Sequence, residues 1–464
     1  MSILGAVQVP HPPLILPEVG HGEEKRIQST IDAFDAAAKF IADLQPDTVI
    51  ISSPHSILYS DYFHISPGER ATGNMSRFGA PQVKLEVNYD ELFAQKLSTL
   101  ASDEKIPAGI LGERNPSLDH GTMIPLRFLQ LAGLDFNRVN FLRIGLSGIN
   151  AATHYKFGQL IARAADELGR KIFFVASGDL SHKLKADGPY GIVPEGAVFD
   201  SQVMDNLSGA KFLRLLTMDE KICSRAAECG LRSFWIMAGA LDRKAVTAEK
   251  LSYEGTFGVG YGIVWFNVGD ADSSRNFDVQ LADFKRRETA RRKSNEDAFV
   301  KLARHSLETF VKTHRVAKLP ANLPDELTSK RAGAFVSLHK DGNLRGCIGT
   351  IMATQDTLAE EILQNAISAC SRDPRFEPVT VDELDDIEYS VDVLGEPERI
   401  FSVKDLDVRR YGVIVENGNR RGLLLPDLEG VDTVEEQIAI AKRKANIRAD
   451  EKVSLWRFEV IRHH

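Results

Sequence analysis

The stretch ILGAVQVPHPPL (residues 3–14) joins a run of apolar residues to a histidine that is enclosed by prolines. The apolar part predicts a buried strand over residues 3–8, because short apolar runs that end at proline are typical of strands in α/β sheets. Pro10 and Pro12 fix their own φ angles and favour extended conformations in the residues before them. We therefore expect His11 just beyond the end of a strand, with little conformational freedom, as suits a ligand.

The first 268 residues alternate short β-branched runs with helical patterns, which is typical of an α/β domain. Strands are predicted over residues 3–8, 48–52, 139–144, 171–176 and 260–267. Helices are predicted over residues 26–44, 90–102, 151–169 and 233–241. The N-terminal domain is thus expected to contain a central β-sheet flanked by helices.

The pattern changes after residue 268. Residues 269–293 begin with a polar, aperiodic stretch and continue as a charged helix, so they are interpreted as a linker and helix. Residues 294–464 predict an α+β domain, with a hairpin through Asp341-Gly342 and a helix over residues 357–371. Asp-Gly between two alternating strands is a strong hairpin signal.

Composition excludes several classes of protein. The 464 residues are 43% hydrophobic and 26% charged, which is typical of globular domains and argues against disorder. The net charge of −8 argues against a general nucleic-acid binder. The four cysteines show no CxxC spacing, and no apolar run approaches the ~20 residues that span a bilayer. These features favour a cytoplasmic protein, neither exported nor embedded in a membrane.

Chemistry-bearing residues follow several of the predicted strands and turns. His11, His55 and His182 lie directly after strands, and ligands of open α/β sheets bind beyond the carboxyl ends of strands. His120 begins a predicted helix, and Glu254 precedes the glycine-rich stretch GTFGVGYG. Two histidines and one carboxylate form the facial ligand set of non-haem Fe(II) oxygenases. Any one histidine, taken alone, is more often a hydrogen-bonded structural residue.

Five motifs in order resemble a known family. VPHPPLILPEVG, SSPHS, DHGTMIPL, SGDLSHK and the late glutamate are similar to the motifs of class III (LigB-type) extradiol ring-cleavage dioxygenases and of the related Memo proteins. The resemblance spans essentially the whole N-terminal domain.

The resemblance implies a function and roles for individual residues. His11, His55 and Glu254 would bind Fe(II), His182 would act as the acid/base, and His120 would orient or polarise the substrate. The implied substrates are a catechol-like aromatic compound and O2. An imidazole with a pKa near neutrality suits this task, because a catechol must lose protons to chelate iron.

Two points beside these assignments stay open. Asp179 and Ser181 could orient His182, but Ser-Gly-Asp is also a good capping turn, and we prefer capping. Memo proteins carry a cysteine near the position interpreted here as Glu254 and are not established ring-cleaving enzymes. The glutamate therefore favours the dioxygenase-like iron site.

The C-terminal domain resembles the AMMECR family through LRGCIG and DPRF, over about residues 297–461. Arg345 could favour a thiolate at Cys347, but we prefer an inert, buried cysteine. Arg372, Asp373 and Arg375 are expected to form an ion-pair cluster with the LRGC loop.

Three functions are therefore weighed. The first is an Fe(II)-dependent extradiol dioxygenase-like enzyme with an AMMECR accessory domain. The second is a Memo-like metal-binding component of a modification or assembly system, since AMMECR and Memo domains are often encoded together with a radical-SAM protein, which would then be a partner. The third is a metal-dependent hydrolase or lyase in the same pocket. Relatives with this fold commonly associate, which makes a homo-oligomer a further expectation.

Overall fold

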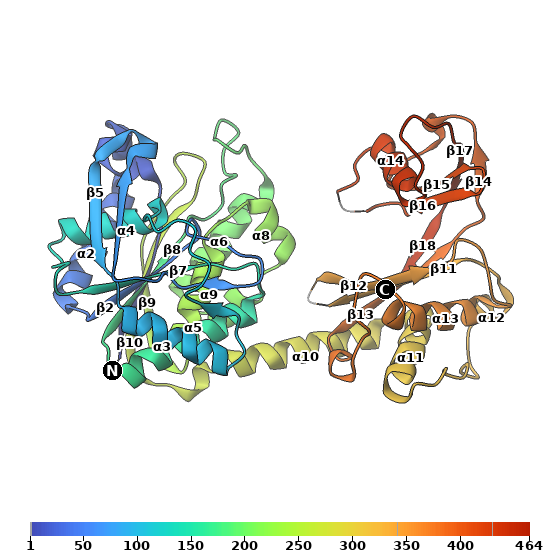
Figure 1. Cartoon of the computed structure of the whole chain (residues 1–464), viewed down its shortest axis with the longest axis horizontal. Coiled ribbons are helices and arrows are strands. Elements are labelled where there is room, and N and C mark those ends of the chain that lie inside the picture. The colour runs from blue at the N-terminus through green and yellow to red at the C-terminus, as the bar shows by residue number, and fades with distance from the viewer. Residues whose placement is uncertain (1, 341, 429) are drawn as a thin grey trace. The chain divides into compact units, whose positions relative to one another are not determined.

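The chain forms two compact units, Met1–Asp283 and Phe284–His464, in a computed structural model that describes residues 2–340, 342–428 and 430–464 (Figure 1). The division falls inside helix α10 (Phe277–Asn295). The first unit therefore continues past Val268, where the sequence predicted its end, because strand β10 (Tyr261–Ala271) runs on into the polar segment.

The first unit is built on a mixed sheet with the strand order β7-β2-β8-β1-β10-β9. The four strands from β7 to β1 are parallel, whereas β10 pairs antiparallel with both β1 and β9. The α/β prediction is confirmed, and all five predicted strands are present. The strands of this unit are β1 (Ile3–Val9), β2 (Thr48–Ser53), β3 (Phe63–His64), β4 (Arg70–Met75), β5 (Ala80–Asn88), β6 (Ala108–Gly109), β7 (Asn140–Gly145), β8 (Ile172–Ser177), β9 (Lys244–Glu254) and β10.

Helices cover both faces of this sheet, as Figure 1 shows. The four predicted helices correspond to α2, α3, α5 and α9. The helices of the unit are α1 (Pro17–Gly20), α2 (Gln28–Leu44), α3 (Glu91–Asp103), α4 (His120–Leu131), α5 (Ala151–Leu168), α6 (Pro194–Ser208), α7 (Phe212–Leu216), α8 (Glu220–Ala226) and α9 (Leu231–Ala240).

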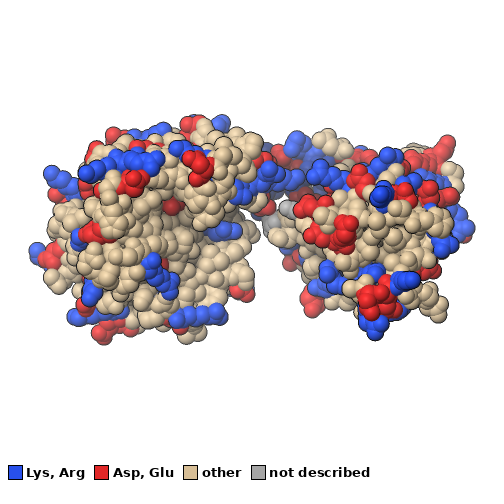
Figure 2. All heavy atoms as spheres, turned by 90° about the horizontal axis from the view of Figure 1, so that it is seen from above, with Lys and Arg blue, Asp and Glu red and all other residues tan. Residues whose placement is uncertain are grey.

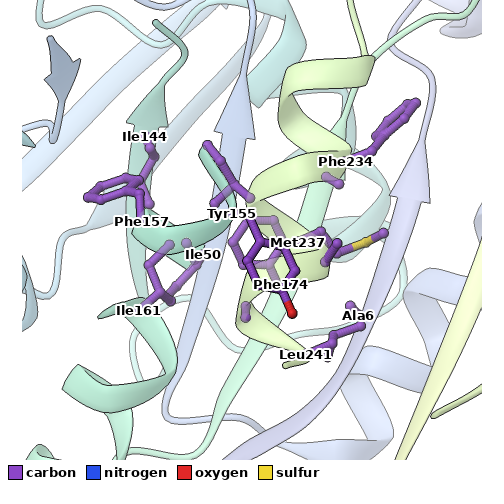
Figure 3. Packing of buried hydrophobic residues seen from close by; sticks show 14 of the residues in the cluster. Ala6, Ile50, Ile144, Tyr155, Phe157, Ile161, Phe174, Phe234, Met237 and Leu241 are labelled. Carbon is purple, nitrogen blue, oxygen red and sulfur yellow. The ribbon is translucent and has the colours of Figure 1, made fainter. Parts of the chain in front are cut away.

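Alternation along the strands divides the core into two layers. Ile50 of β2 belongs to the layer formed with α5 and α9, whose side chains pack closely in Figure 3. Its neighbours Val49 and Ile51 belong to the layer formed with α2 and α4. Successive side chains of a strand point to opposite faces, so a central strand needs apolar residues at nearly every position. This explains why the central strands of the sheet are continuous apolar runs in the sequence.

The second unit contains two four-stranded sheets, of order β12-β11-β13-β18 and β14-β17-β15-β16. The predicted hairpin is confirmed as the antiparallel pair β11–β12, although residue 341 of its turn lies outside the described residues. The strands of the second unit are β11 (Ala334–Lys340), β12 (Asn343–Gly349), β13 (Ile387–Leu394), β14 (Glu398–Ile400), β15 (Gly412–Asn417), β16 (Arg420–Leu424), β17 (Ser454–Phe458) and β18 (Val460–His463). Its helices are α11 (Ala298–Thr313), α12 (Asp325–Ser329), α13 (Leu358–Ser371) and α14 (Val434–Lys444).

The surface carries charges of both signs. Basic and acidic side chains are interspersed among uncharged residues on the face that Figure 2 shows. Among the described residues, none of the helices combines the length and the apolar character that crossing a bilayer requires.

Candidate metal centre

His11 lies immediately after β1, and contacts hold its backbone N–H and its Nδ1. Its side chain is 1% exposed, and its backbone N–H donates to Asp179 Oδ1 at 2.7 Å. Its Nδ1 lies 2.9 Å from Ser177 Oγ, and the Ser177 hydroxyl donates to the carbonyl of Gly121 at 2.6 Å. Because a hydroxyl has only one proton, Ser177 must accept from Nδ1–H of a neutral His11. This leaves the lone pair of Nε2 free to bind a metal.

The imidazole rings of His55 and His120 lie close to that of His11. His55, after β2, places its Nε2 2.9 Å from Nε2 of His11. His120, the first residue of α4, stacks near His55 with ring centroids 4.0 Å apart. One nitrogen from each ring lies within 4.8 Å of the others. The parallel neighbours β2, β8 and β1 end at one edge of the sheet, so they deliver these loops to one place.

The surroundings keep the three imidazoles neutral. Burial, and then the charge of His55, hold the pKa of His11 well below its usual value. Partial burial lowers the pKa of His55, although the carboxylates of Asp119 and Asp179 oppose the effect. Burial and the charges of the other two rings lower the pKa of His120 to about 3. Neutral imidazole is the form that binds transition metals, so the cluster fits such an ion.

Cys229, which the sequence interpretation passed over, also reaches the cluster. Its Sγ lies 3.6 Å from Nε2 of His11. Nitrogen and sulfur ligands held tetrahedrally at ~2.0–2.3 Å from one ion lie about 3.3–3.7 Å apart, so this separation suits a shared metal. Burial raises the pKa of the thiol well above its usual value, so metal binding would have to displace its proton. The similarity to Memo proteins, which carry a cysteine, was the signal that could have identified it.

Glu254 is not brought to the three imidazoles. Its Oε2 accepts hydrogen bonds from the backbone N–H of Thr30, at 2.8 Å, and from the Thr30 hydroxyl, at 2.6 Å. Thr30 lies in the first turn of α2, where backbone N–H groups lack partners within the helix and favour a carboxylate. Among the described residues, the group that could hold a metal comprises His11, His55 and His120. The geometry therefore supports His120, or Cys229, rather than Glu254 beside the first two histidines.

The loop after β8 brings His182 and Asp179 to the same edge of the sheet. The charge of His182 acts on both His11 and His55, and its buried Nδ1 has no hydrogen-bond partner among the described residues. Asp179 begins no helix, contrary to the capping that we preferred, because its carboxylate is occupied by the N–H of His11. Burial raises the pKa of Asp179 to about 6. A fourth histidine and a nearby carboxyl group thus lie beside the imidazole cluster.

A cavity of about 410 Å³ opens beside His55 and His120. Asp119 lines it, caps α4 through Thr122 N–H, and accepts a hydrogen bond from Ser53 Oγ at 2.6 Å. Ligand pockets of small-molecule enzymes are typically about 300–1,000 Å³, so the cavity could hold a single aromatic ring.

Cys347, one of the two cysteines of the second unit, has a different environment. Arg345 forms an ion pair with Glu383 at 3.0 Å and does not activate the thiol. Burial raises the pKa of Cys347, as an inert cysteine requires. The predicted cluster is present in part: Asp373 pairs with Arg375 at 2.7 Å and accepts a hydrogen bond from the backbone N–H of Cys347.

Comparisons with known families agree with this division of the chain. Residues 5–264 match the family described as the catalytic LigB subunit of aromatic ring-opening dioxygenase. Residues 300–463 match the AMMECR1 family.

Similar proteins occur in other organisms. The chain is 42% identical over 471 aligned residues to the protein CA_C1420 of Clostridium acetobutylicum, covering 100% of this chain and 99% of that protein. A protein of Thermotoga maritima is 54% identical over 170 residues, which cover 36% of this chain and 98% of that protein.

Two solved structures show partial likeness. PH0010 of Pyrococcus horikoshii has a TM-score of 0.33 and 34% identity, covering 35% of this chain and 88% of that one. JW3007 of Escherichia coli K12 has a TM-score of 0.39 and 18% identity, covering 56% of this chain and 99% of that one.

Proposed function

Because the chain belongs to the family of the catalytic LigB subunit of aromatic ring-opening dioxygenases, we propose that its first unit is an Fe(II)-dependent extradiol dioxygenase-like enzyme for a catechol-like substrate. The convergence of three neutral imidazoles at the edge of the sheet carries this proposal. Bound Fe(II) would hold the catechol diolate and O2 side by side and allow electrons to pass between them.

The chain's own residues account for the rest of the chemistry. Ser177 fixes the tautomer of His11 and so directs its Nε2 toward the shared position. His182, which has an unpartnered buried nitrogen, would take a proton from a catechol hydroxyl and later return it. Asp179 lies near His182, and the charge of His182 acts on its carboxyl group. The cavity beside His55 and His120 would admit the ring.

Oxygen uptake tests this proposal. The full chain, purified without oxygen and reconstituted with Fe(II), is expected to consume O2 in the presence of at least one catechol and to form a yellow ring-opened product. An oxygen electrode and absorption spectra measure the two events. The metal-free chain serves as the control. No catechol-dependent uptake across a broad panel, with iron fully bound, would contradict ring opening.

Cys229 supports a second candidate, a Memo-like metal-binding component of a modification or assembly system that also uses the AMMECR unit. The thiol lies 3.6 Å from His11 Nε2, whereas Glu254 is bound to Thr30. A radical-SAM protein would then be the partner.

Metal content and spectroscopy of a Cys229→Ser variant distinguish the two candidates. If the thiol binds the ion, the Co(II)-loaded full chain is expected to show an intense sulfur-to-cobalt charge-transfer band in the near ultraviolet that Cys229→Ser loses. Cys223→Ser, the matched control on α8, is expected to keep the band. An absent band in the cobalt-loaded parent chain would exclude Cys229 as a ligand and leave the three-histidine site.

A further inference from the structure

The loop after β8 that contains His182 is held by hydrogen bonds to two other segments. The backbone N–H of Leu180 donates to the carbonyl of Gly260 at 2.9 Å, and the N–H of Gly260 donates to the carbonyl of Ser181 at 2.8 Å. The Ser181 hydroxyl and the backbone N–H of His182 both donate to the carbonyl of Ala226, at 3.0 and 3.1 Å. The backbone beside His182 therefore has a defined position.

Asp200, on α6, binds this loop through its side chain. Its Oδ1 accepts the backbone N–H of Ser181 at 2.7 Å, and its Oδ2 accepts the hydroxyl of Tyr253 at 2.7 Å. A Cβ on residue 260 would collide with Oδ2, so the carboxylate can lie here because that residue is Gly260. Asp200 thus joins the loop to both α6 and β9.

The carboxyl group of Asp200 is buried without a counter-charge. Asp200 is 1% exposed, and its neighbours Phe199, Val203 and Met204 on α6 belong to the hydrophobic core. Among the residues that the structure describes, its partners are the Ser181 N–H and the Tyr253 hydroxyl, and no cation pairs with it. Burial raises its pKa to about 7. Because a buried charge without a partner ion costs stability, packing alone does not account for a carboxyl group at this place.

We propose that Asp200 is a positioning residue for His182. By accepting the N–H of Ser181, its side chain fixes the backbone directly before His182 and so sets the place of the imidazole beside the metal centre. The buried Nδ1 of His182 has no hydrogen-bond partner among the described residues, so this nitrogen does not anchor the ring. The proposal rests on the proposed function, because it concerns how the same acid/base group is held.

NMR signals of the histidine rings in the full chain test the positioning directly. The chain is labelled with ¹⁵N in its imidazoles and loaded with Zn(II), which is diamagnetic, and His182→Phe identifies the signals of His182. Asp200→Ala removes the acceptor for the Ser181 N–H. It is expected to shift or broaden the His182 signals and to leave those of the three clustered imidazoles in place. Asp200→Asn keeps an oxygen that can accept from Ser181, so it is expected to restore the His182 signals.

Turnover supplies the second measurement. The Fe(II)-loaded Asp200→Ala chain is expected to keep its iron and its KM for a catechol but to lose about 10–100-fold in kcat, because small displacements of a reacting group are that costly. Asp200→Asn is expected to retain most of kcat. Because Asp200→Asn also removes a buried charge, it should unfold at about pH 8 at no lower temperature than the parent chain.

Asp90→Asn is the matched control. Asp90 is also a buried carboxylate of the first unit, but it pairs with Arg170 at 3.2 Å and caps α3 through the N–H of Phe93. Losing this ion pair is expected to lower the temperature of unfolding, while the His182 signals and kcat stay unchanged. If Asp200→Ala does not fold, Asp200→Leu, which fills the space with an apolar side chain, replaces it with the same expectations.

The two measurements separate failure of this proposal from failure of the proposed function. If the parent chain turns over no catechol, ring opening fails, and the His182 signals alone decide whether Asp200 positions the ring. Signals and kcat like those of the parent in a folded Asp200→Ala chain would overturn the proposal. Losses in Asp200→Asn as large as those in Asp200→Ala would overturn it as well, because the hydrogen bond to Ser181 would not be what matters.

Discussion

Replacing His11 with alanine is expected to abolish metal binding by the first unit. His11 is the most buried of the three imidazoles, and its Nε2 lies 2.9 Å from Nε2 of His55 and 3.6 Å from Sγ of Cys229. Loss of an outer partner of a ligand typically weakens metal affinity about 10–100-fold, and loss of the ligand itself should exceed this. Iron content after anaerobic reconstitution and Co(II) titration of the full chain measure the effect.

Glu254→Gln provides the matched control for His11→Ala. Glutamine keeps an oxygen that accepts from Thr30, so the start of α2 is preserved. This variant is expected to retain a full complement of iron. Circular dichroism and thermal unfolding of both variants show whether the fold persists. Iron loss in Glu254→Gln, or its retention in folded His11→Ala, would contradict the ligand assignment made from the geometry.

Replacing His182 with phenylalanine is expected to leave the iron in place and to lower turnover. His182 lies beside the cluster, but it is not one of the three histidines whose nitrogens lie close enough together to share a metal ion. General acid–base groups contribute about 10²–10⁴-fold to rate, so oxygen uptake with the best catechol should fall by that order.

Tyr190→Phe is the control for His182→Phe. The Tyr190 ring lies against that of His182, with centroids 5.4 Å apart, and this change removes only an exposed hydroxyl. Turnover is expected to stay near that of the parent chain. Iron loss in His182→Phe would make His182 a metal ligand, and unchanged turnover would remove its acid/base role.

Local patterns in the sequence predicted the parts of the fold that depend on near neighbours. Five of the six strands of the central sheet were evident, because strands that are buried on both faces are continuous apolar runs. The edge strand β9 was missed, since its residues are largely half-buried or exposed and lack such a run. The position of the boundary between the units was also hard to predict, because the boundary falls inside the polar helix α10.

The sequence by itself determined the stiff turns that hold His11 and His55 at the ends of β1 and β2, the two strands that flank β8. Proline geometry and the strand period act over a few residues, so those positions follow from local chemistry. Only the tertiary structure decided what completes the cluster. The pairing of β9 with β10 sets Glu254 opposite Tyr261 at the end of β9. There the Glu254 side chain meets Thr30 on α2, a residue that is distant in the chain. Cys229 reaches His11 because the loop before α9 packs against Asp179, a contact between residues that are distant in the chain.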